Sequence, residues 1–271
     1  MEQLKRVTSA VIILPPLLCF LYFAPHEFFF ILILVLVTLS LREYFQMLAL
    51  SQFPVCSRIS YMLAFLLVSS AYFGGVPWLP MTVSFAMVAL TISTLLTAQP
   101  SSQRFLVLLH SLFGVFFIGW TLSHLVLIRS LPAGKWYIFF LCAIVWVADS
   151  VAMYVGKSIG RHKMALSISP GKTWEGAAGG VIGGAATAIA SGYFLVPQLT
   201  IWQRILLGVL LSIAAQISDL GESMIKRYTG VKDSGELIPG HGGLLDRIDS
   251  VLFAAPTLLY TLHFLQHGPA I

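Results

Sequence analysis

Long runs of apolar residues, separated by short polar or charged stretches, fill most of this chain of 271 residues. A helix that spans a bilayer needs about 20 mostly apolar residues, and nine runs approach or reach that length. The second run is short, and an alternative is that it continues past Arg42 towards Leu50. The predicted spans cover approximately residues 7–24, 28–41, 59–76, 79–98, 105–128, 136–156, 174–196, 201–220 and 250–266.

The first run begins just after Lys5 and Arg6, as the apolar part of a signal peptide would. No convincing small-residue cleavage site follows it, and apolar sequence resumes almost at once. We therefore predict a retained helix that is kinked or interrupted at Pro15 and Pro16.

Composition agrees with a lipid environment. Hydrophobic residues make up 58% of the chain and charged residues 10%, whereas an ordinary soluble domain has about 25% charged residues. This balance excludes a disordered chain, a basic nucleic-acid-binding domain and a soluble enzyme with one large core. The predicted fold class is all-α: a polytopic integral membrane protein with about nine transmembrane helices and no nucleic-acid partner.

Basic residues fall unequally on the two predicted sides of the membrane. Cytoplasmic loops carry an excess of Lys and Arg. With the N-terminus in the cytosol, only three of the 16 basic residues lie outside, namely Arg129, Lys135 and Arg204. The bias favours a cytosolic N-terminus and an outside C-terminus in the cytoplasmic (inner) membrane.

Acidic residues gather in the second half of the chain. Of 11 Asp and Glu residues, seven lie within residues 175–249, and Asp149 lies just upstream. Glu27 and Glu43 stand at the ends of predicted spans, where a solvated or snorkelling carboxylate is expected.

Two membrane regions are predicted from this distribution. Residues 1–135 hold five spans that serve as a scaffold, with lipid access or oligomer contacts as further roles. Residues 136–271 form the catalytic region, with four spans and two large loops, about 157–173 and 221–249, that face the cytosol. The active site is therefore expected on the cytosolic side.

Carboxylates at the cytosolic ends of three predicted helices indicate a cation site. Asp219 and Glu222 share one helix face, and Asp246 and Asp249 repeat the same spacing. Asp149 lies roughly 10 Å from the cytosolic end of its helix at 1.5 Å per residue. Ionisable groups at membrane depth normally face a polar cavity or a partner, and Mg²⁺ binds carboxylate oxygens together with substrate phosphates. We predict that these five carboxylates bind magnesium.

Basic residues interleave with these acids and offer two interpretations. In one, Lys226, Arg227 and Arg247 only form structural ion pairs with Asp219, Asp246 and Asp249. In the other, they hold phosphates together with Lys232 and with Lys172, which precedes the seventh predicted helix and its N-terminal amides. For Lys157, Arg161 and Lys163, the positive-inside bias is an equally good explanation.

Glycines occur in three patterns with different meanings. The segment PGHGG, residues 239–243, lets the backbone approach an anion around His241, although a simple turn would look the same. Residues 171–173 imitate the end of a phosphate-binding P-loop, but Leu166 stands where that motif needs its first glycine. Gly176, Gly180 and Gly184, four apart, indicate close helix packing.

Taken together, the segment SMIKRYTGVKDSGELIPGHGGLLDRIDS, residues 223–250, resembles the signature of phosphatidate cytidylyltransferases, also called CDP-diacylglycerol synthases. The upstream segment ADSVAMYVGKSIGRHKMALSISPGKTWEG, residues 148–176, is similar to a second block of that family, with departures at Met153 and Gly171. The matching signature residues are Ser223, Lys226, Arg227, Lys232, Asp233, Pro239, His241, Gly242, Gly243, Asp246, Arg247 and Asp249.

The resemblance implies a reaction in which CTP and phosphatidate give CDP-diacylglycerol and pyrophosphate, with Mg²⁺ assisting and a second cation left open. It implies catalytic roles for Asp219, Lys226, Arg227, Lys232, Asp233, His241, Asp246, Arg247 and Asp249, and binding roles for Lys172, Ser169, Gly242 and Gly243. It is also compatible with a homodimer, although no residue identifies an interface.

Two other classes of protein fit less well. A secondary transporter also binds ions at buried carboxylates, but such folds usually show internal repeats and broken helices near the midplane. A CDP-alcohol phosphotransferase would carry a DG-x-x-AR motif with downstream aspartates, which this sequence lacks.

Overall fold

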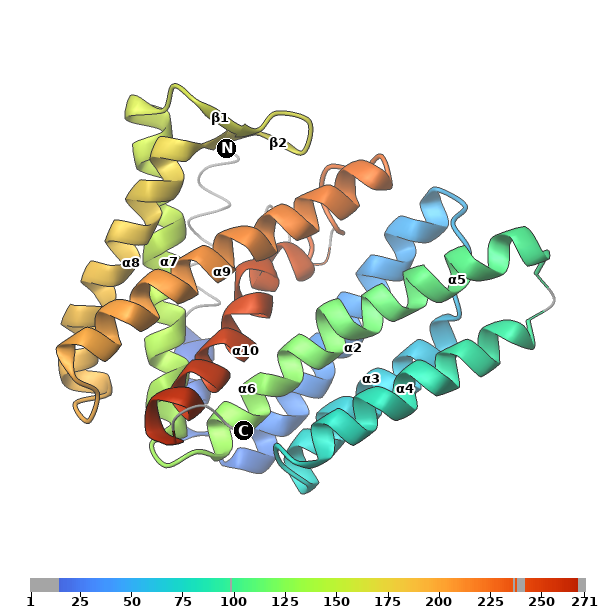
Figure 1. Cartoon of the computed structure of the whole chain (residues 1–271), viewed down its shortest axis with the longest axis horizontal. Helices are drawn as coiled ribbons and strands as arrows, with labels where there is room; N and C mark the ends of the chain where they lie inside the picture. The colour runs from blue at the N-terminus through green and yellow to red at the C-terminus, as the bar shows by residue number, and fades with distance from the viewer. Residues whose placement is uncertain (1–14, 98, 236, 238–241, 268–271) are drawn as a thin grey trace. The chain divides into compact units, whose positions relative to one another are not determined.

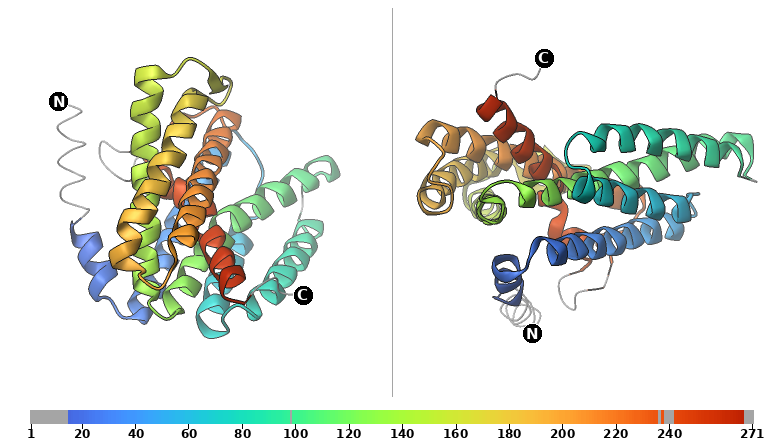
Figure 2. Two further views of the ribbon diagram at one scale, coloured as in Figure 1. Left: turned by 60° about the vertical axis from the view of Figure 1, so that its left-hand side comes forward. Right: turned by 90° about the horizontal axis from the view of Figure 1, so that it is seen from below.

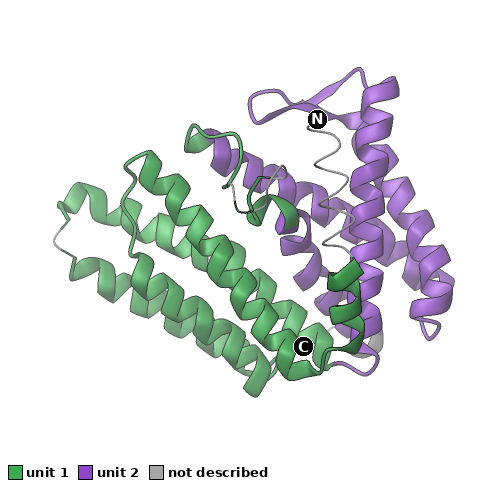
Figure 3. Ribbon diagram, turned by 180° about the vertical axis from the view of Figure 1, so that it is seen from behind, with its two compact units in different colours: residues 1–130, 228–247 green, residues 131–227, 248–271 purple. Residues whose placement is uncertain are grey.

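The computed structural model describes residues 15–97, 99–235, 237 and 242–267. The chain forms two compact units (Figure 3). Unit 1 comprises residues 1–130 and 228–247, and unit 2 comprises residues 131–227 and 248–271.

Unit 1 is built from apolar helices, labelled in Figure 1. Residues 15–23 are helical, and they are followed by α2 (His26–Leu50), α3 (Ser57–Phe73), α4 (Trp78–Leu95), α5 (Ser101–Gly114), the π-helix η1 (Val115–Trp120) and α6 (Thr121–Ser130). On α2, buried apolar residues recur every four positions at Phe29, Ile33, Val37 and Leu41. This spacing gives the helix one stripe that packs against its neighbours.

The α5, η1 and α6 segments form one continuous apolar stretch, Ser101–Ser130. The π-helical turn in its middle is a rare conformation. At this turn, Gly119 packs so closely on α3 that an added Cβ would lie 2.9 Å from the Ala64 Cβ.

Unit 2 contains α7 (Gly134–Ile159), β1 (Lys163–Ala165), β2 (Ser169–Thr173) and α8 (Trp174–Leu195), together with most of α9 (Ile201–Tyr228) and of α10 (Leu245–His267). The strands form an antiparallel hairpin in which Lys163 pairs with Thr173 and Ala165 with Ser169. The sequence predicts a loop over residues 157–173, so the hairpin is an addition to the predicted fold.

Helices α7 and α8 lie side by side in both views of Figure 2. An added Cβ at Gly176 would lie 2.7 Å from the Ala152 carbonyl oxygen, and one at Gly180 would lie 2.9 Å from the Ala148 carbonyl oxygen. Gly184 instead approaches Ser212 of α9. The prediction that these glycines serve close helix packing is confirmed. Gly176 and Gly180 pack on α7, and Gly184 packs on α9.

Seven helices of the described residues are long and apolar enough to cross a membrane. The polytopic, nearly all-α fold is therefore supported, whereas nine spans and the orientation of the termini are not confirmed. The helix Ser57–Phe73 is apolar but has only 17 residues, and the first predicted span lies partly outside the described residues. The second span does continue past Arg42, because α2 runs to Leu50. The candidate spans are His26–Leu50, Trp78–Leu95, Ser101–Ser130, Gly134–Ile159, Trp174–Leu195, Ile201–Tyr228 and Leu245–Leu265.

Candidate active site

A cavity of about 280 Å³ lies within unit 2, where α7, the hairpin, α8 and α9 meet. Its charged lining comes from Asp149 and Lys157 of α7, Lys172 of β2 and Asp219 of α9, and further polar residues of the lining are Ser169, Thr173 and Gln216. The structure thus brings together four residues that were predicted from segments far apart in the chain. Lys157, whose role the sequence left open, joins them.

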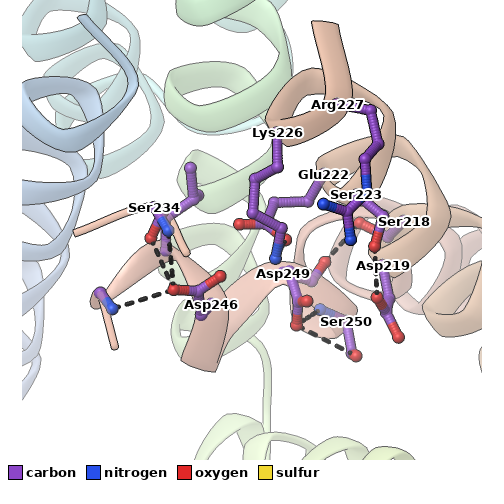
Figure 4. Close-up of polar contacts among 12 residues, drawn as sticks. Ser218, Asp219, Glu222, Ser223, Lys226, Arg227, Ser234, Asp246, Asp249 and Ser250 are labelled. Carbon is purple, nitrogen blue, oxygen red and sulfur yellow. Dashed lines mark hydrogen bonds and ion pairs between the residues drawn. The ribbon is translucent and has the colours of Figure 1, made fainter. Parts of the chain in front are cut away.

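An ion pair joins two sides of this cavity. The Lys172 Nζ atom lies 2.7 Å from Asp219 Oδ2, and both side chains are partly exposed. Ser223, one turn further along α9, donates its hydroxyl to Asp219 Oδ1 at 3.4 Å (Figure 4). Lys172 is therefore a cation that a carboxylate holds at the cavity.

The N-terminus of α8 lies directly beside Lys172. The Thr173 side chain caps this helix by accepting the Gly176 N–H at 3.1 Å. Glu175, in the first turn, pairs with the His162 ring at 2.6 Å and ties the base of the hairpin to the helix. These contacts fix the strand that carries Lys172 and Ser169.

Two further aspartates of unit 2 lie near Asp219. Asp149 on α7 lines the same cavity as Asp219, and Asp249 on α10 is hydrogen-bonded to Ser218, which precedes Asp219 in the chain. Asp249 Oδ1 accepts the Ser250 backbone N–H at 2.6 Å, and the Asp249 carbonyl accepts the Ser218 hydroxyl (Figure 4). Three helices thus contribute carboxylates to one region, as the sequence predicted for these three residues.

The remaining charged residues at the end of α9 make other contacts. Glu222 is fully buried and pairs with Lys226 one turn away. Arg227 donates its Nε–H to the Ile168 carbonyl at 3.0 Å and so reaches the hairpin. These contacts partly match the structural ion-pair interpretation, although the carboxylate that pairs with Lys226 is Glu222.

The carboxylates of unit 2 suit a hard cation in their chemistry. Within the described parts of the chain, no group of three or more His, Cys, Asp and Glu side chains is arranged to hold a metal ion. Mg²⁺, however, is usually bound through one or two carboxylates, with waters and substrate phosphates as its other ligands. One or two of Asp149, Asp219 and Asp249 would be enough by that criterion, and magnesium at this position stays a prediction.

The segment before α10 that resembles the family signature belongs to unit 1. Its residues Ser234 and Gly243 are held by hydrogen bonds to Asp246. Asp246 Oδ2 accepts the Ser234 N–H at 3.0 Å, the Ser234 hydroxyl at 2.9 Å and the Gly243 N–H at 2.9 Å (Figure 4). Gly242 has φ +79°, which favours glycine. Lys232, Asp233 and Arg247 are exposed. Pro239 and His241 lie outside the described residues.

Glu43 of α2 corrects one expectation from the sequence. It is 4% exposed, so it is not a solvated carboxylate at a span end. Its oxygens accept the Leu244 N–H at 2.8 Å, the Leu245 N–H at 2.8 Å and the Ser234 hydroxyl at 3.1 Å. The sequence did hold a signal for it, because α2 continues to Leu50 and an acid inside an apolar span is by default a candidate for function.

Comparison with known proteins gives the family. A family model described as "Cytidylyltransferase family" matches residues 4–265. The chain belongs to the cytidylyltransferase family. The resemblance seen in residues 148–176 and 223–250 is confirmed, and the predicted enzyme class, nucleotidyltransferase, agrees with this membership.

Individual relatives share the name phosphatidate cytidylyltransferase. The relative from Bacillus subtilis (strain 168) is 45% identical over 149 residues, which cover 54% of this chain and 55% of the relative. The one from Brucella abortus biovar 1 (strain 9-941) is 46% identical over 151 residues, 54% of each protein. The one from Staphylococcus aureus (strain COL) is 37% identical over 186 residues, 67% of this chain and 70% of the relative. The matches to the first two span about half the length of those relatives.

Proposed function

We propose that this protein transfers the cytidylyl group of CTP to phosphatidate, giving CDP-diacylglycerol and pyrophosphate for phospholipid synthesis. The observation that carries the proposal is the family match over residues 4–265, with relatives named phosphatidate cytidylyltransferase. The cavity with Lys172, Asp219 and Asp149 supports it, because cations and carboxylates meet there.

The reaction needs little proton transfer. An anionic oxygen of the phosphatidate phosphate attacks the α-phosphorus of CTP, a new P–O bond forms, and the bond from the α-phosphorus to the oxygen that bridges to the β-phosphate breaks. Pyrophosphate leaves with that electron pair. Because the nucleophile is already ionised, the protein's task is to bring two anions together and to stabilise the charge that develops between them.

Basic side chains of this chain supply part of that stabilisation. Lys172 would leave Asp219 to hold a phosphate at the cavity, aided by Ser169 on the same strand. Lys226 and Arg227 at the end of α9 would assist in unit 2. Lys232, His241 and Arg247, with the glycine loop around Gly242 and Gly243, would hold the triphosphate or the lipid phosphate.

Magnesium is part of the proposal. Asp219, with Asp149 and Asp249 as neighbours, would hold the ion, and bound Mg²⁺ would polarise phosphoryl oxygens and neutralise their charge. The sequence also predicts metal binding by Glu222 in unit 2 and by Asp246 in unit 1. These two roles and a second cation stay predictions.

The two substrates come from different phases, which sets the proposed location. Phosphatidate is a membrane lipid, whereas CTP is dissolved in the cytosol. The helices that can cross a membrane support a multi-pass protein, and we propose the inner membrane with the site open to the cytosol.

A lipid-labelling assay tests the proposal. The protein is purified in detergent and incubated with CTP labelled at the α-phosphate, Mg²⁺ and phosphatidate. We expect the label to enter lipid with phosphatidate and not with diacylglycerol, and Asp219→Asn to abolish incorporation without unfolding the protein. If labelled CDP-diacylglycerol is consumed while CTP is never incorporated, the protein uses CDP-diacylglycerol as a substrate instead. Absence of both reactions would favour a transporter.

A further inference from the structure

The buried carboxylate of Glu43 serves a segment about 200 residues further along the chain. It lies in α2, within the half of the protein that the sequence predicted to be a scaffold. Three donors converge on it, the backbone N–H groups of Leu244 and Leu245 and the hydroxyl of Ser234. All three belong to unit 1, so the contacts form within one compact unit.

Glu43 accepts hydrogen bonds from the backbone N–H groups at the start of α10. The first N–H groups of a helix have no partner within the helix, and α10 begins at Leu245. A negative charge is also stabilised at a helix N-terminus, where the helix dipole is positive. Most helices are capped by a nearby residue, whereas here a carboxylate from another helix binds this end.

A shared hydroxyl links Glu43 to Asp246. The Ser234 Oγ atom lies 3.1 Å from Glu43 Oε2 and 2.9 Å from Asp246 Oδ2. One hydroxyl proton can be donated to only one carboxylate at a time, so the orientations of the two carboxylates depend on each other through Ser234.

The space around Glu43 is matched to its side chain. A Cβ atom added to Gly243 would lie 2.6 Å from Glu43 Oε2, and one added to Gly235 would lie 2.9 Å from Oε1. Both glycines belong to the segment that resembles the family signature. Residues 235 and 243 therefore approach the Glu43 side chain this closely because they carry no side chains.

We propose that Glu43 is a positioning residue for cytidylyl transfer: it fixes Ser234, Leu244 and the first turn of α10, which carries Asp246. The inference rests on the proposed function and adds to it a residue from the N-terminal half. Glu43 acts through Ser234 and the backbone, without touching substrate.

Glu43→Gln tests the proposal with almost no change of volume. The amide group would present an NH₂ donor where one carboxylate oxygen now accepts an N–H. Because small misplacements of reacting groups can lower rates about 100-fold, we expect kcat per folded molecule to fall about 10- to 100-fold. The KM for CTP should change much less. Glu43→Asp, which keeps the charge, should recover part of the lost kcat.

Glu27→Gln is the matched control, because Glu27 lies on the same helix and is exposed. It should retain wild-type kcat. Ser234→Ala removes the link to Asp246 but keeps both backbone contacts of Glu43, so it should lower kcat even if Glu43→Gln fails to fold.

Two outcomes would overturn the inference, and they differ from each other. If wild-type protein labels lipid and folded Glu43→Gln or Ser234→Ala matches it in kcat, with only the melting temperature lowered, Glu43 has a structural role alone. If wild-type protein leaves the lipid unlabelled, the proposed function fails first and the inference fails with it.

Discussion

Replacing Lys172 by Met separates the two roles that an ion pair at the cavity can have. The substitution keeps an unbranched side chain of similar length and removes the ammonium that lies 2.7 Å from Asp219 Oδ2. If Lys172 serves only as a structural partner of Asp219, the main effect is on stability. If it also holds a phosphate, the main effect is on transfer.

The structure sets the size of both effects. The Lys172 and Asp219 side chains are 24% and 30% exposed, and the Lys172 Nζ atom is buried, so the pair should contribute about 1 kcal/mol to stability, the upper end of the range for exposed pairs. A hydrogen bond to a charged group contributes about 1.5–3 kcal/mol. If that interaction is lost in the transition state, kcat/KM for CTP should fall about 10- to 150-fold.

The assay compares Lys172→Met with Lys163→Met, both purified in detergent. Lys163 is a basic residue of the same hairpin that is exposed and not part of the cavity lining. Lipid labelling gives kcat/KM for CTP, and thermal unfolding gives stability. Activity of Lys172→Met within twofold of wild type, or a loss no larger than that of Lys163→Met, would refute a phosphate-binding role.

Three further predictions concern packing, charge burial and metal. Gly176→Ala should destabilise unit 2 by about 1–3 kcal/mol, because its Cβ would meet the Ala152 carbonyl oxygen at 2.7 Å, whereas Gly171→Ala, with open space around it, should leave thermal unfolding unchanged. Lys226→Met should lower the free energy of unfolding by about 3–5 kcal/mol, because it removes the ammonium that pairs with the fully buried Glu222. A double variant, Lys226→Met with Glu222→Gln, that is no more stable than Lys226→Met alone would contradict this explanation. Chelation of divalent cations should stop lipid labelling, added Mg²⁺ should restore it, and labelling that continues in excess chelator would exclude a magnesium requirement.

The helices could be predicted from sequence because their cause is local. Apolar runs of sufficient length form helices in lipid, where every backbone group must find an internal partner, and the runs at 136–156 and 174–196 correspond closely to α7 and α8. The glycine spacing in α8 predicted close packing for the same local reason. Gly176 and Gly180 pack on α7, whereas Gly184 packs on α9. Which helix each glycine meets depends on the path of the chain and could not be inferred from the spacing.

Part of the candidate site could also be predicted from the sequence. The positions of Asp149, Asp219 and Asp249 near the ends of their helices follow from helix geometry. In unit 2, Asp149 and Asp219 line one cavity, and Asp249 is hydrogen-bonded to Ser218. The ion-pair partner of each charged residue could not be predicted from the sequence. Glu222 pairs with Lys226, a partner that the sequence did not indicate, and its metal role stays a prediction. Lys172 lies on a strand that the sequence did not indicate.

Glu43 was missed because its partners are distant in the chain. Residue type and local context showed only an acid beside Arg42 near the end of an apolar run. Its hydrogen-bond donors are Ser234, Leu244 and Leu245, which lie 191 to 202 residues further along the chain. These hydrogen bonds form only once unit 1 has folded.

The hairpin of residues 163–173 also indicates which solvent surrounds the cavity. A two-stranded sheet has outer edges whose N–H and C=O groups find no partner in a ladder, and in hydrocarbon each such group would cost several kcal/mol. We therefore expect the exposed residues of the hairpin to lie among lipid headgroups or in water. Since β2 carries Ser169 and Lys172, the proposed nucleotide substrate would then reach this wall without entering the acyl layer, and the proposed lipid substrate would need to expose only its headgroup to meet it.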